Sequence, residues 1–582
     1  MHHCAARKAR SFAVLSLRVV ATALAILCVF ASFTDDARAQ TPRARRETRD
    51  KSTENANEGA TAPTRRGAPL EISLPPVAEK DEFNLDASGM DAAAWFDPSR
   101  GAALRAKSLE IARARRARWP KFDALESRPG VRELRSKRIR LRTDLPSSKE
   151  VDQIPEILEA EIPLVCDFFK IDSSRFDDLE IEAFLMADVG YFQAIRAIDG
   201  SPQFLYGYSY GDRIYAKTQK TAYYDRFLLA HELVHTLMHE IFGDLRPRWY
   251  SEGTAEFLAL HFWNEAERTL EIARFPSRED EFPGFGRLEQ VRKLAALGAT
   301  PTIREIMAFE PRDFVDVSTY SWCWAFSTFL HRSPKYRRIA EMLPYWMVAD
   351  DPNKLFIDAV GDRWGELEYD WSDFVARIDY NYDFAATAID YGAADRRPSR
   401  EELLRGVVVE ARADAGWQRV GVRLEAGKTH RVATSGRYEF YLPCAERALP
   451  FEAPGATCQY LFGIPAGRLL AVVAPDVRGM TFSDVYGDAK TNDGDGDRFR
   501  FDAFRREAAR APRFDGVDDP LYPWSELHEF ASSSIKIEPK RDGELFLRVN
   551  ASPQDLAKNG GRVKVQVKLI DETTTKPEKN EK

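Results

Sequence analysis

The feature that most constrains this chain is the pentapeptide His231-Glu232-Leu233-Val234-His235, which lies in an apolar stretch with helical spacing. Residues four apart share one face of a helix, so both imidazoles can reach one cation at the ~2.0–2.1 Å of zinc–nitrogen bonds. Glu232 lies one position further round the helix, where its carboxylate stands beside the open coordination position. The spacing predicts two zinc ligands, His231 and His235, and a general base, Glu232, for a zinc-bound water.

A catalytic zinc needs a third protein ligand, and the residues after His235 show which kind of site is expected. A metzincin would carry Gly and His where this chain has Met238 and Ile241, so that class is excluded. Glu252 instead follows His235 by seventeen residues, in the segment Trp249-Tyr250-Ser251-Glu252-Gly253-Thr254-Ala255-Glu256. This arrangement resembles that of the gluzincin metallopeptidases.

The resemblance is to secreted bacterial zincin-like proteins of the peptidase MA-like group, and it is specific around residues 231–256. It implies that a second helix returns across the first and that Glu252 is the third ligand. Glu256, one helical turn later, is expected to accept a hydrogen bond from the outer nitrogen of a ligating histidine. The implied cofactor is Zn²⁺.

Two further features bear on the reaction. Tyr320 opens an aromatic helix, and its hydroxyl is a candidate to stabilise the oxyanion; the alternative is core packing, because that helix is apolar nearly all round. Residues 204–210 and 213–217 are predicted to form a hairpin through Gly211-Asp212, and zincins use such an edge to bind an extended peptide.

Two other motifs are weaker. Gly207-Tyr208-Ser209-Tyr210-Gly211 matches the G-x-S-x-G nucleophile elbow, but an elbow leads from strand into helix, and residues 212–217 have β character. Asp493, Asp495 and Asp497 begin like a calcium-binding loop, but Arg498 and Phe504 occupy its required Gly and Glu positions. A solvated acidic loop is favoured there, with an unrelated calcium loop as the alternative.

The N-terminus has the pattern of an export signal. Basic residues precede an apolar run from Val19 to Phe33, and Ala37-Arg38-Ala39 resembles a cleavage site. Residues 1–39 are therefore predicted to be a signal peptide of an exported, periplasmic, extracellular or cell-surface protein. An uncleaved anchor is the alternative, although the run is shorter than the ~20 residues that span a bilayer. Residues 40–90 lack apolar periodicity and are expected to be a disordered leader.

The 582 residues exceed what one core holds and predict several domains. A helical segment, 91–134, precedes an α+β domain over 135–395, which is expected to be zincin-like, with a mixed sheet and active-site helices. Short β-rich runs then predict an all-β sandwich over 400–571, and the polar end, 572–582, is predicted to be disordered. Cys444 and Cys458 could form a disulfide, a question that their spacing leaves open.

The β region resembles the calcium-dependent galactose-binding lectin β-sandwich of bacteria, in GWQRVGVRLEAGKTHRVATSGR from Gly416 and GELFLRVNASPQDLAKNGGRVKVQV from Gly543. Such lectins ligate calcium with an Asn-Asp pair where this chain has Asn550-Ala551, and of the later ligands only Asn559 remains. The resemblance implies a jelly-roll-like accessory domain, with glycan binding as a further expectation.

A net charge of −7 and 30% charged residues indicate a soluble surface without a nucleic-acid footprint or a transmembrane helix in the mature chain. The predicted function is an exported zinc metallopeptidase that hydrolyses peptide bonds of a peptide or protein substrate. Two alternatives remain. One is an inactive, zinc-stabilised binding or scaffold protein; the other is a carbohydrate-targeted surface protein led by the β domain.

Overall fold

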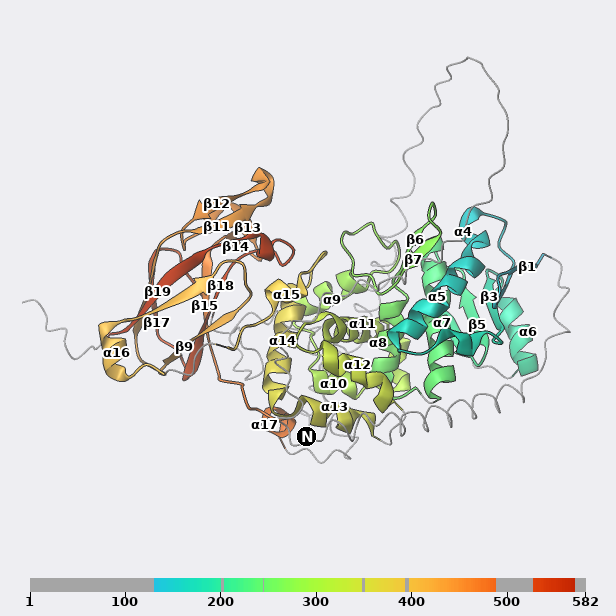
Figure 1. The fold of residues 1–582 in the computed structure, drawn as a ribbon, viewed down its shortest axis with the longest axis horizontal. Helices are drawn as coiled ribbons and strands as arrows, with labels where there is room; N and C mark the ends of the chain where they lie inside the picture. Colours follow the sequence, from blue (N-terminus) through green and yellow to red (C-terminus); the bar gives the residue numbers. More distant parts are fainter. Residues whose placement is uncertain are drawn as a thin grey trace, which may run out of the picture. The chain divides into compact units, whose positions relative to one another are not determined.

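A mixed sheet, a layer of helices and a strand-rich region follow one another along the chain (Figure 1). This computed structural model describes residues 130–199, 204–243, 245–347, 351–392, 397–487 and 527–570, all within the larger of two units, Pro69–Lys582. The predicted signal peptide, leader, acidic loop 493–497 and tail 572–582 lie outside the described residues. The class is α+β, as predicted from the sequence. Among the described helices, none has the length and hydropathy needed to cross a bilayer.

The first sheet has the strand order β1-β2-β3-β5-β4. β1 (Arg132–Arg135) pairs antiparallel with β2 (Ile139–Thr143), whereas β2, β3 (Ile181–Met186) and β5 (Arg213–Lys217) are parallel. β4 (Gly207–Tyr210) is an antiparallel edge strand. Because β1 begins at Arg132, the last residues of the segment predicted to be helical, 91–134, form a strand instead.

The predicted hairpin is confirmed in β4 and β5. Gly211 has φ +65 in the two-residue turn, a conformation that glycine adopts without steric cost. The first strand begins at Gly207 rather than at Phe204, although the Tyr206 carbonyl still accepts a hydrogen bond from the Lys217 N–H.

Both faces of this sheet are covered. One face packs against α5 (Ile154–Phe168) and α7 (Ala222–Phe242), and the other against α6 (Val189–Asp199). The alternating residues of β3 show the division: Ile181, Ala183 and Leu185 join the α5/α7 core, whereas Phe184 and Met186 pack with Tyr191 and Phe192 of α6.

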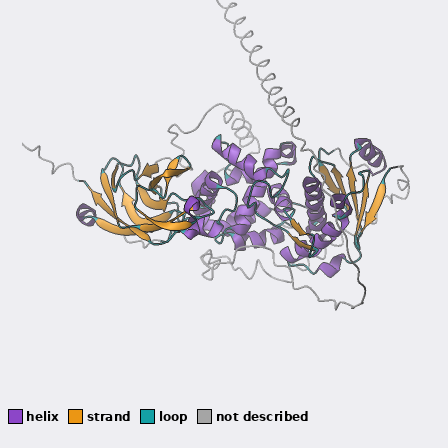
Figure 2. Ribbon diagram, turned by 90° about the horizontal axis from the view of Figure 1, so that it is seen from above, coloured by secondary structure: helices purple, strands orange, loops and turns teal. Residues whose placement is uncertain are grey.

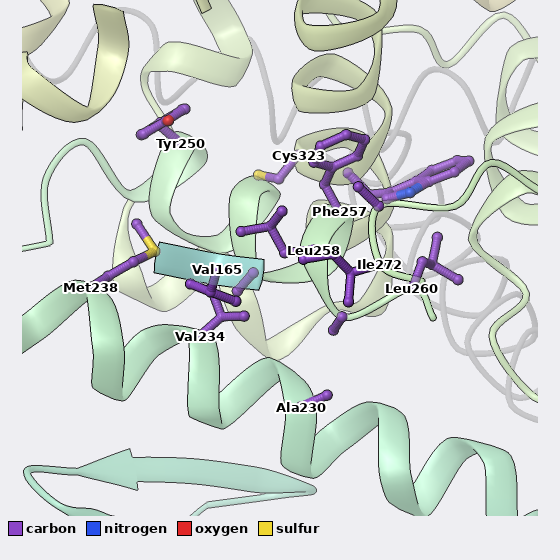
Figure 3. Packing of buried hydrophobic residues seen from close by; sticks show 14 of the residues in the cluster. Val165, Ala230, Val234, Met238, Tyr250, Phe257, Leu258, Leu260, Ile272 and Cys323 are labelled. Atoms are coloured by element: carbon purple, nitrogen blue, oxygen red, sulfur yellow. The ribbon is translucent and has the colours of Figure 1, made fainter. Parts of the chain in front are cut away.

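α7 carries the histidine motif and is buried on nearly all sides. It begins where the Thr221 side chain accepts a hydrogen bond from the Tyr224 N–H, and it ends at Gly243, whose φ of +84 suits glycine. The apolar spacing of the sequence predicts a helix over about residues 225–241, and α7 is longer at both ends. Figure 3 shows part of the core around it, with Ala230, Val234 and Met238 beside Val165, Leu258 and Leu260.

The prediction that residues 302–380 are mostly helical is confirmed. α11 (Val317–Arg332) lies at the centre of this layer and packs against both α8 (Arg248–Leu258) and α9 (Arg287–Ala296). Around it lie α10 (Ile303–Met307), α12 (Arg337–Trp346), α13 (Pro352–Val360), α14 (Trp364–Arg377) and α15 (Phe384–Thr387).

One helix boundary was predicted wrongly. The sequence favoured a helix continuing from Pro247 to about Arg268, but α8 ends at Leu258 and a ribbon of β6 (Phe262–Asn264) and β7 (Thr269–Glu271) follows. The Asn264 side chain accepts hydrogen bonds from two backbone N–H groups in the following turn, an alternative to the helix that asparagine often supplies.

The strand-rich region forms a two-sheet sandwich (Figure 2). Alternate residues of its strands meet in one apolar core. One sheet has the order β17-β10-β19-β8 and the other β16-β15-β18-β9. The strands are β8 (Val407–Arg412), β9 (Gln418–Leu424), β10 (His430–Ser435), β15 (Leu469–Ala474), β16 (Leu527–Glu529), β17 (Ser534–Ile537), β18 (Gly543–Val549) and β19 (Arg562–Leu569). α16 (Arg400–Arg405) and two hairpins, β11 (Tyr438–Leu442) with β12 (Arg447–Phe451) and β13 (Ala456–Leu461) with β14 (Ile464–Ala466), complete it.

A short helix within this region belongs to the helical layer by its packing. α17 (Phe482–Tyr486) follows β15, and its Phe482 ring lies 4.9 Å from the Trp364 ring of α14. The Tyr486 hydroxyl donates a hydrogen bond to the buried carboxylate of Glu368. The chain therefore returns from the sandwich to the helices before it enters β16.

Candidate metal centre

α7 places two imidazoles one helical turn apart and buries both. The Nε2 atoms of His231 and His235 lie 3.1 Å from each other, and the two residues are only 5% and 6% exposed. The spacing of four residues thus directs both rings to one point, as expected from the sequence.

Glu252 reaches the same point from α8. Its Oε2 lies 3.1 Å from the Nε2 of His235 and 3.4 Å from the Nε2 of His231. The neighbouring Gly253 explains this approach, since a Cβ there would lie 2.3 Å from the Ser327 Oγ and 2.4 Å from the Cys323 carbonyl oxygen of α11. A glycine at this position allows α8 to pack directly against α11, which brings Glu252 over the histidines.

These three side chains form the only group of three or more potential ligands found among the described residues. Ligands ~2.0–2.2 Å from a tetrahedral zinc ion stand about 3.3–3.6 Å apart, close to the observed 3.1 to 3.4 Å. Two histidines and one carboxylate are also a common donor set of catalytic zinc. The residues present therefore fit a zinc ion, and their convergence without a cation would need shared protons.

The electrostatics of the group agree with this fit. Burial lowers the pKa of His231, but the hydrogen bond to Glu252 and the carboxylates of Glu232 and Glu256 outweigh it and raise the pKa to about 9. Burial raises the pKa of Glu252, but the two imidazoles hold it well below its usual range. The surroundings therefore favour positive charge at the centre, whether protons or a metal ion supply it.

Glu232 lies on the side of α7 that faces the edge strand β4. A Cβ at Gly207 would lie 2.7 Å from the Glu232 Oε1, and the Ser209 side chain lowers the pKa of the same carboxylate. Burial raises the pKa of Glu232, although both imidazoles oppose the rise. The carboxylate is thus held between the metal-binding face and the strand.

Gly207 and Ser209 were not predicted as site residues. They belong to the G-x-S-x-G pattern, which is a strand and a hairpin turn here rather than a nucleophile elbow. The signal that could have found them is the alternation of a strand, since residues two apart face the same side. Tyr208 and Tyr210, which alternate with them along the strand, stack on each other on the opposite side.

Glu256 lies behind the imidazole of His231, but at a distance too long for the hydrogen bond that was predicted. Its Oε1 is 3.7 Å from the Nδ1 of His231, the ring nitrogen that faces away from the metal position. Two N–H groups of Arg287 donate to the two oxygens of Glu256, each at a donor–acceptor distance of 3.0 Å. Arg287 has no motif in the sequence and was not predicted.

Tyr320 borders the site. Its ring centroid lies 6.3 Å from that of His231, and burial together with the charges of Glu252 and Glu232 raises its pKa far above the usual value, so the hydroxyl keeps its proton. The ring also packs against Phe314, with 5.1 Å between centroids. The structure thus brings Tyr320 close to the centre, while most of its helix is core.

Other expectations have structural outcomes. His239 caps the end of α7, with its Nδ1 2.7 Å from the Gly243 carbonyl oxygen. Cys458 is an exposed, free thiol, whereas the side chain of Cys444 lies outside what the structure describes. Asn550 and Asn559, the amides that the lectin resemblance singled out, are buried and bonded to the backbone of neighbouring strands and turns. Their amide groups connect strands and turns of the sandwich.

Comparisons with known proteins add no assignment. No protein-family model matches the chain, and a search of curated proteins finds no matching sequence.

Proposed function

We propose that this chain is a zinc-dependent hydrolase that cleaves peptide bonds, with the metal held by His231, His235 and Glu252. The observation that carries the proposal is the convergence of three donor atoms within 3.1 to 3.4 Å of one another. A fourth group, Glu232, is buried beside them on the adjacent helical position. A metal-binding site without chemistry would not need that carboxylate.

Each residue has a role in this proposal. Zinc would supply Lewis-acid polarisation of a carbonyl and would acidify a water molecule. Glu232 would take the proton from the attacking water and pass it to the leaving nitrogen. Tyr320, whose hydroxyl stays protonated, would donate a hydrogen bond to the oxyanion.

The edge strand suggests how a peptide would bind. Lys217 N–H donates to the Tyr206 carbonyl, so in this register the backbone groups of residues 206, 208 and 210 pair with β5. The N–H and C=O groups of Gly207 and Ser209 therefore point away from the sheet. An extended peptide could pair with them as an additional strand, directly above Glu232.

The test compares the mature wild-type protein with Glu232→Gln against a broad peptide library. Cleavage by the wild type that falls at least ~10²-fold in the variant is expected, because general bases contribute about 10²–10⁴-fold. Metal analysis should find about one zinc per chain, lost in His231→Ala and in His235→Ala. Equal cleavage by both proteins would exclude Glu232 as the base.

The inactive scaffold is the outcome to distinguish. It predicts that zinc binds to wild type and to Glu232→Gln alike and that no library peptide is cut by either. The coverage of Glu232 by β4, which leaves that residue 7% exposed, is the observation on which this alternative rests.

A further inference from the structure

Arg287 connects the first turn of α9 to the back of the metal centre. It is 6% exposed, and its Nε and Nη2 donate to the two carboxylate oxygens of Glu256, each at a distance of 3.0 Å. This two-point contact sets the orientation of the carboxylate as well as its charge, which a single lysine ammonium could not do.

The orientation matters because of the imidazole beyond it. His231 can bind a metal through Nε2 only when Nδ1 carries the ring proton. Among the described residues no hydrogen-bond partner is found for this Nδ1, and the Glu256 Oε1 lies 3.7 Å from it. Glu256 is therefore the group that favours the metal-binding tautomer of His231.

Arg287 is itself held from three sides. Its Nη2 also donates to the Tyr224 hydroxyl of α7 at a distance of 3.2 Å, and its guanidinium lies 5.9 Å from the ring centroid of Tyr320 in α11. The turn before it supports this position, because Gly284 and Gly286 have φ of +92 and +62. A Cβ at Gly284 would lie 2.9 Å from the Thr221 Oγ1, so this turn packs closely against the start of α7.

We infer that Arg287 is a positioning residue that sets the metal affinity of the centre by orienting Glu256 toward His231. The inference rests on the proposed metal site but not on peptide cleavage. The pair of Arg287 and Glu256 links α9, α8 and α7, so that the ligand on one helix is oriented by a cation on another.

The test measures the zinc dissociation constant of the full-length mature protein by competition with a chelator. Arg287→Met should weaken zinc binding about 10–100-fold, the usual effect of losing a partner of a metal ligand, and Glu256→Gln should do the same. The double variant should be no weaker than either single variant, because both act on one contact. Arg287→Lys, which restores the charge without the two-point contact, should fall in between.

Arg292 provides the matched control. It is another arginine of α9, and its Nη1 lies 3.0 Å from the Asp379 Oδ1 in a surface ion pair. The two side chains are 45% and 37% exposed. Arg292→Met should leave the zinc constant within about twofold, since exposed pairs contribute little.

Folding is assessed separately, by circular dichroism and thermal unfolding of the metal-free proteins. If Arg287→Met does not fold because Glu256 is left buried and unpaired, Arg287→Lys and the double variant, which removes both charges, decide the question. An unchanged zinc constant in a folded Arg287 variant would overturn the inference. Wild-type protein that binds zinc but cuts no peptide would contradict the proposed function alone.

Discussion

Gly207 and Ser209 are the small residues through which the edge strand meets Glu232. The glycine lets the strand approach the carboxylate, and the Ser209 side chain lowers the pKa of Glu232. Neither feature depends on a positive φ, since Gly207 has an ordinary strand conformation. The close approach of the strand to Glu232 therefore depends on the absence of a side chain at Gly207.

Gly207→Ala is expected to lower kcat about 10–100-fold and leave the zinc content unchanged. The added Cβ would displace the base by a fraction of an ångström to an ångström, and misplacement of a reacting group by ~1 Å can cost that much. Steady-state kinetics on a cleaved library peptide, with metal analysis, measures both. Tyr208→Phe is the control, because its ring faces Phe204 on the other side of the strand. Wild-type kcat in Gly207→Ala would show that the strand does not position the base.

The helix pair α8 and α11 shows the same principle on a larger scale. Gly253 lies against Ser327 and the Cys323 carbonyl, so the two helices are packed backbone to backbone at the residue next to Glu252. The geometry of the third ligand is therefore determined by helix packing as well as by the ligand's own side chain.

Gly253→Ala should lower both the free energy of unfolding and the zinc affinity. Overpacking of this kind costs about 1–3 kcal/mol, and any shift of α8 moves Glu252 away from the histidines. Chemical denaturation of the metal-free protein and chelator competition test the two effects. Gly560→Ala, whose Cβ would meet only the Glu439 Cβ at 3.7 Å, should change stability by less than ~0.5 kcal/mol. Full zinc affinity in Gly253→Ala would separate the packing from the ligand.

Local signals predicted the elements that local forces determine. The spacing of the histidines and the turn at Gly211-Asp212 each act within a few residues, and α7 and the hairpin were predicted from them. Arg287 could not be predicted in the same way, because it meets Glu256 only after α8, a β-ribbon and a long loop have folded. The end of α8 was missed because the turn at Asn264 competes with helical propensity.

The predicted domain limits also depend on packing that the sequence does not display. A change from helical to β-rich pattern at about residue 400 marks the start of the sandwich, yet α17 lies beyond it and packs on Trp364 of the helical layer. A five-residue helix has too little periodicity to reveal which core it joins.

Tyr486→Ala is expected to destabilise the protein by about 1–3 kcal/mol, since the buried Glu368 carboxylate loses one of its two donors and ring contacts are lost. Burial raises the pKa of Glu368 to about 7 against the hydrogen bond from Tyr486, which lowers it. A raised folded-state pKa favours the folded state at low pH, and this contribution is lost as pH rises through about 7. Loss of the Tyr486 hydrogen bond, which lowers the pKa of Glu368, makes ionised Glu368 more costly in the folded variant. The destabilisation should therefore be larger at pH 8, where Glu368 is ionised, than at pH 5.

Urea denaturation at the two pH values measures this difference. Tyr460→Ala is the control, because this tyrosine of β13 is 57% exposed and belongs to the sandwich. An equal effect of the two substitutions, or no dependence on pH, would indicate that α17 does not support the helical layer.

The position of α17 also has a consequence in time. A chain that emerges from its N-terminus, from a ribosome or an export channel, releases Trp364 long before Phe482 and Tyr486. Until they arrive, the face of α14 around Trp364 and Glu368 stays uncovered, and several sandwich strands are already outside. The helical layer is thus completed only by α17, which follows β8 to β15 in the sequence. Until α17 is available, the apolar face of α14 is exposed to solvent.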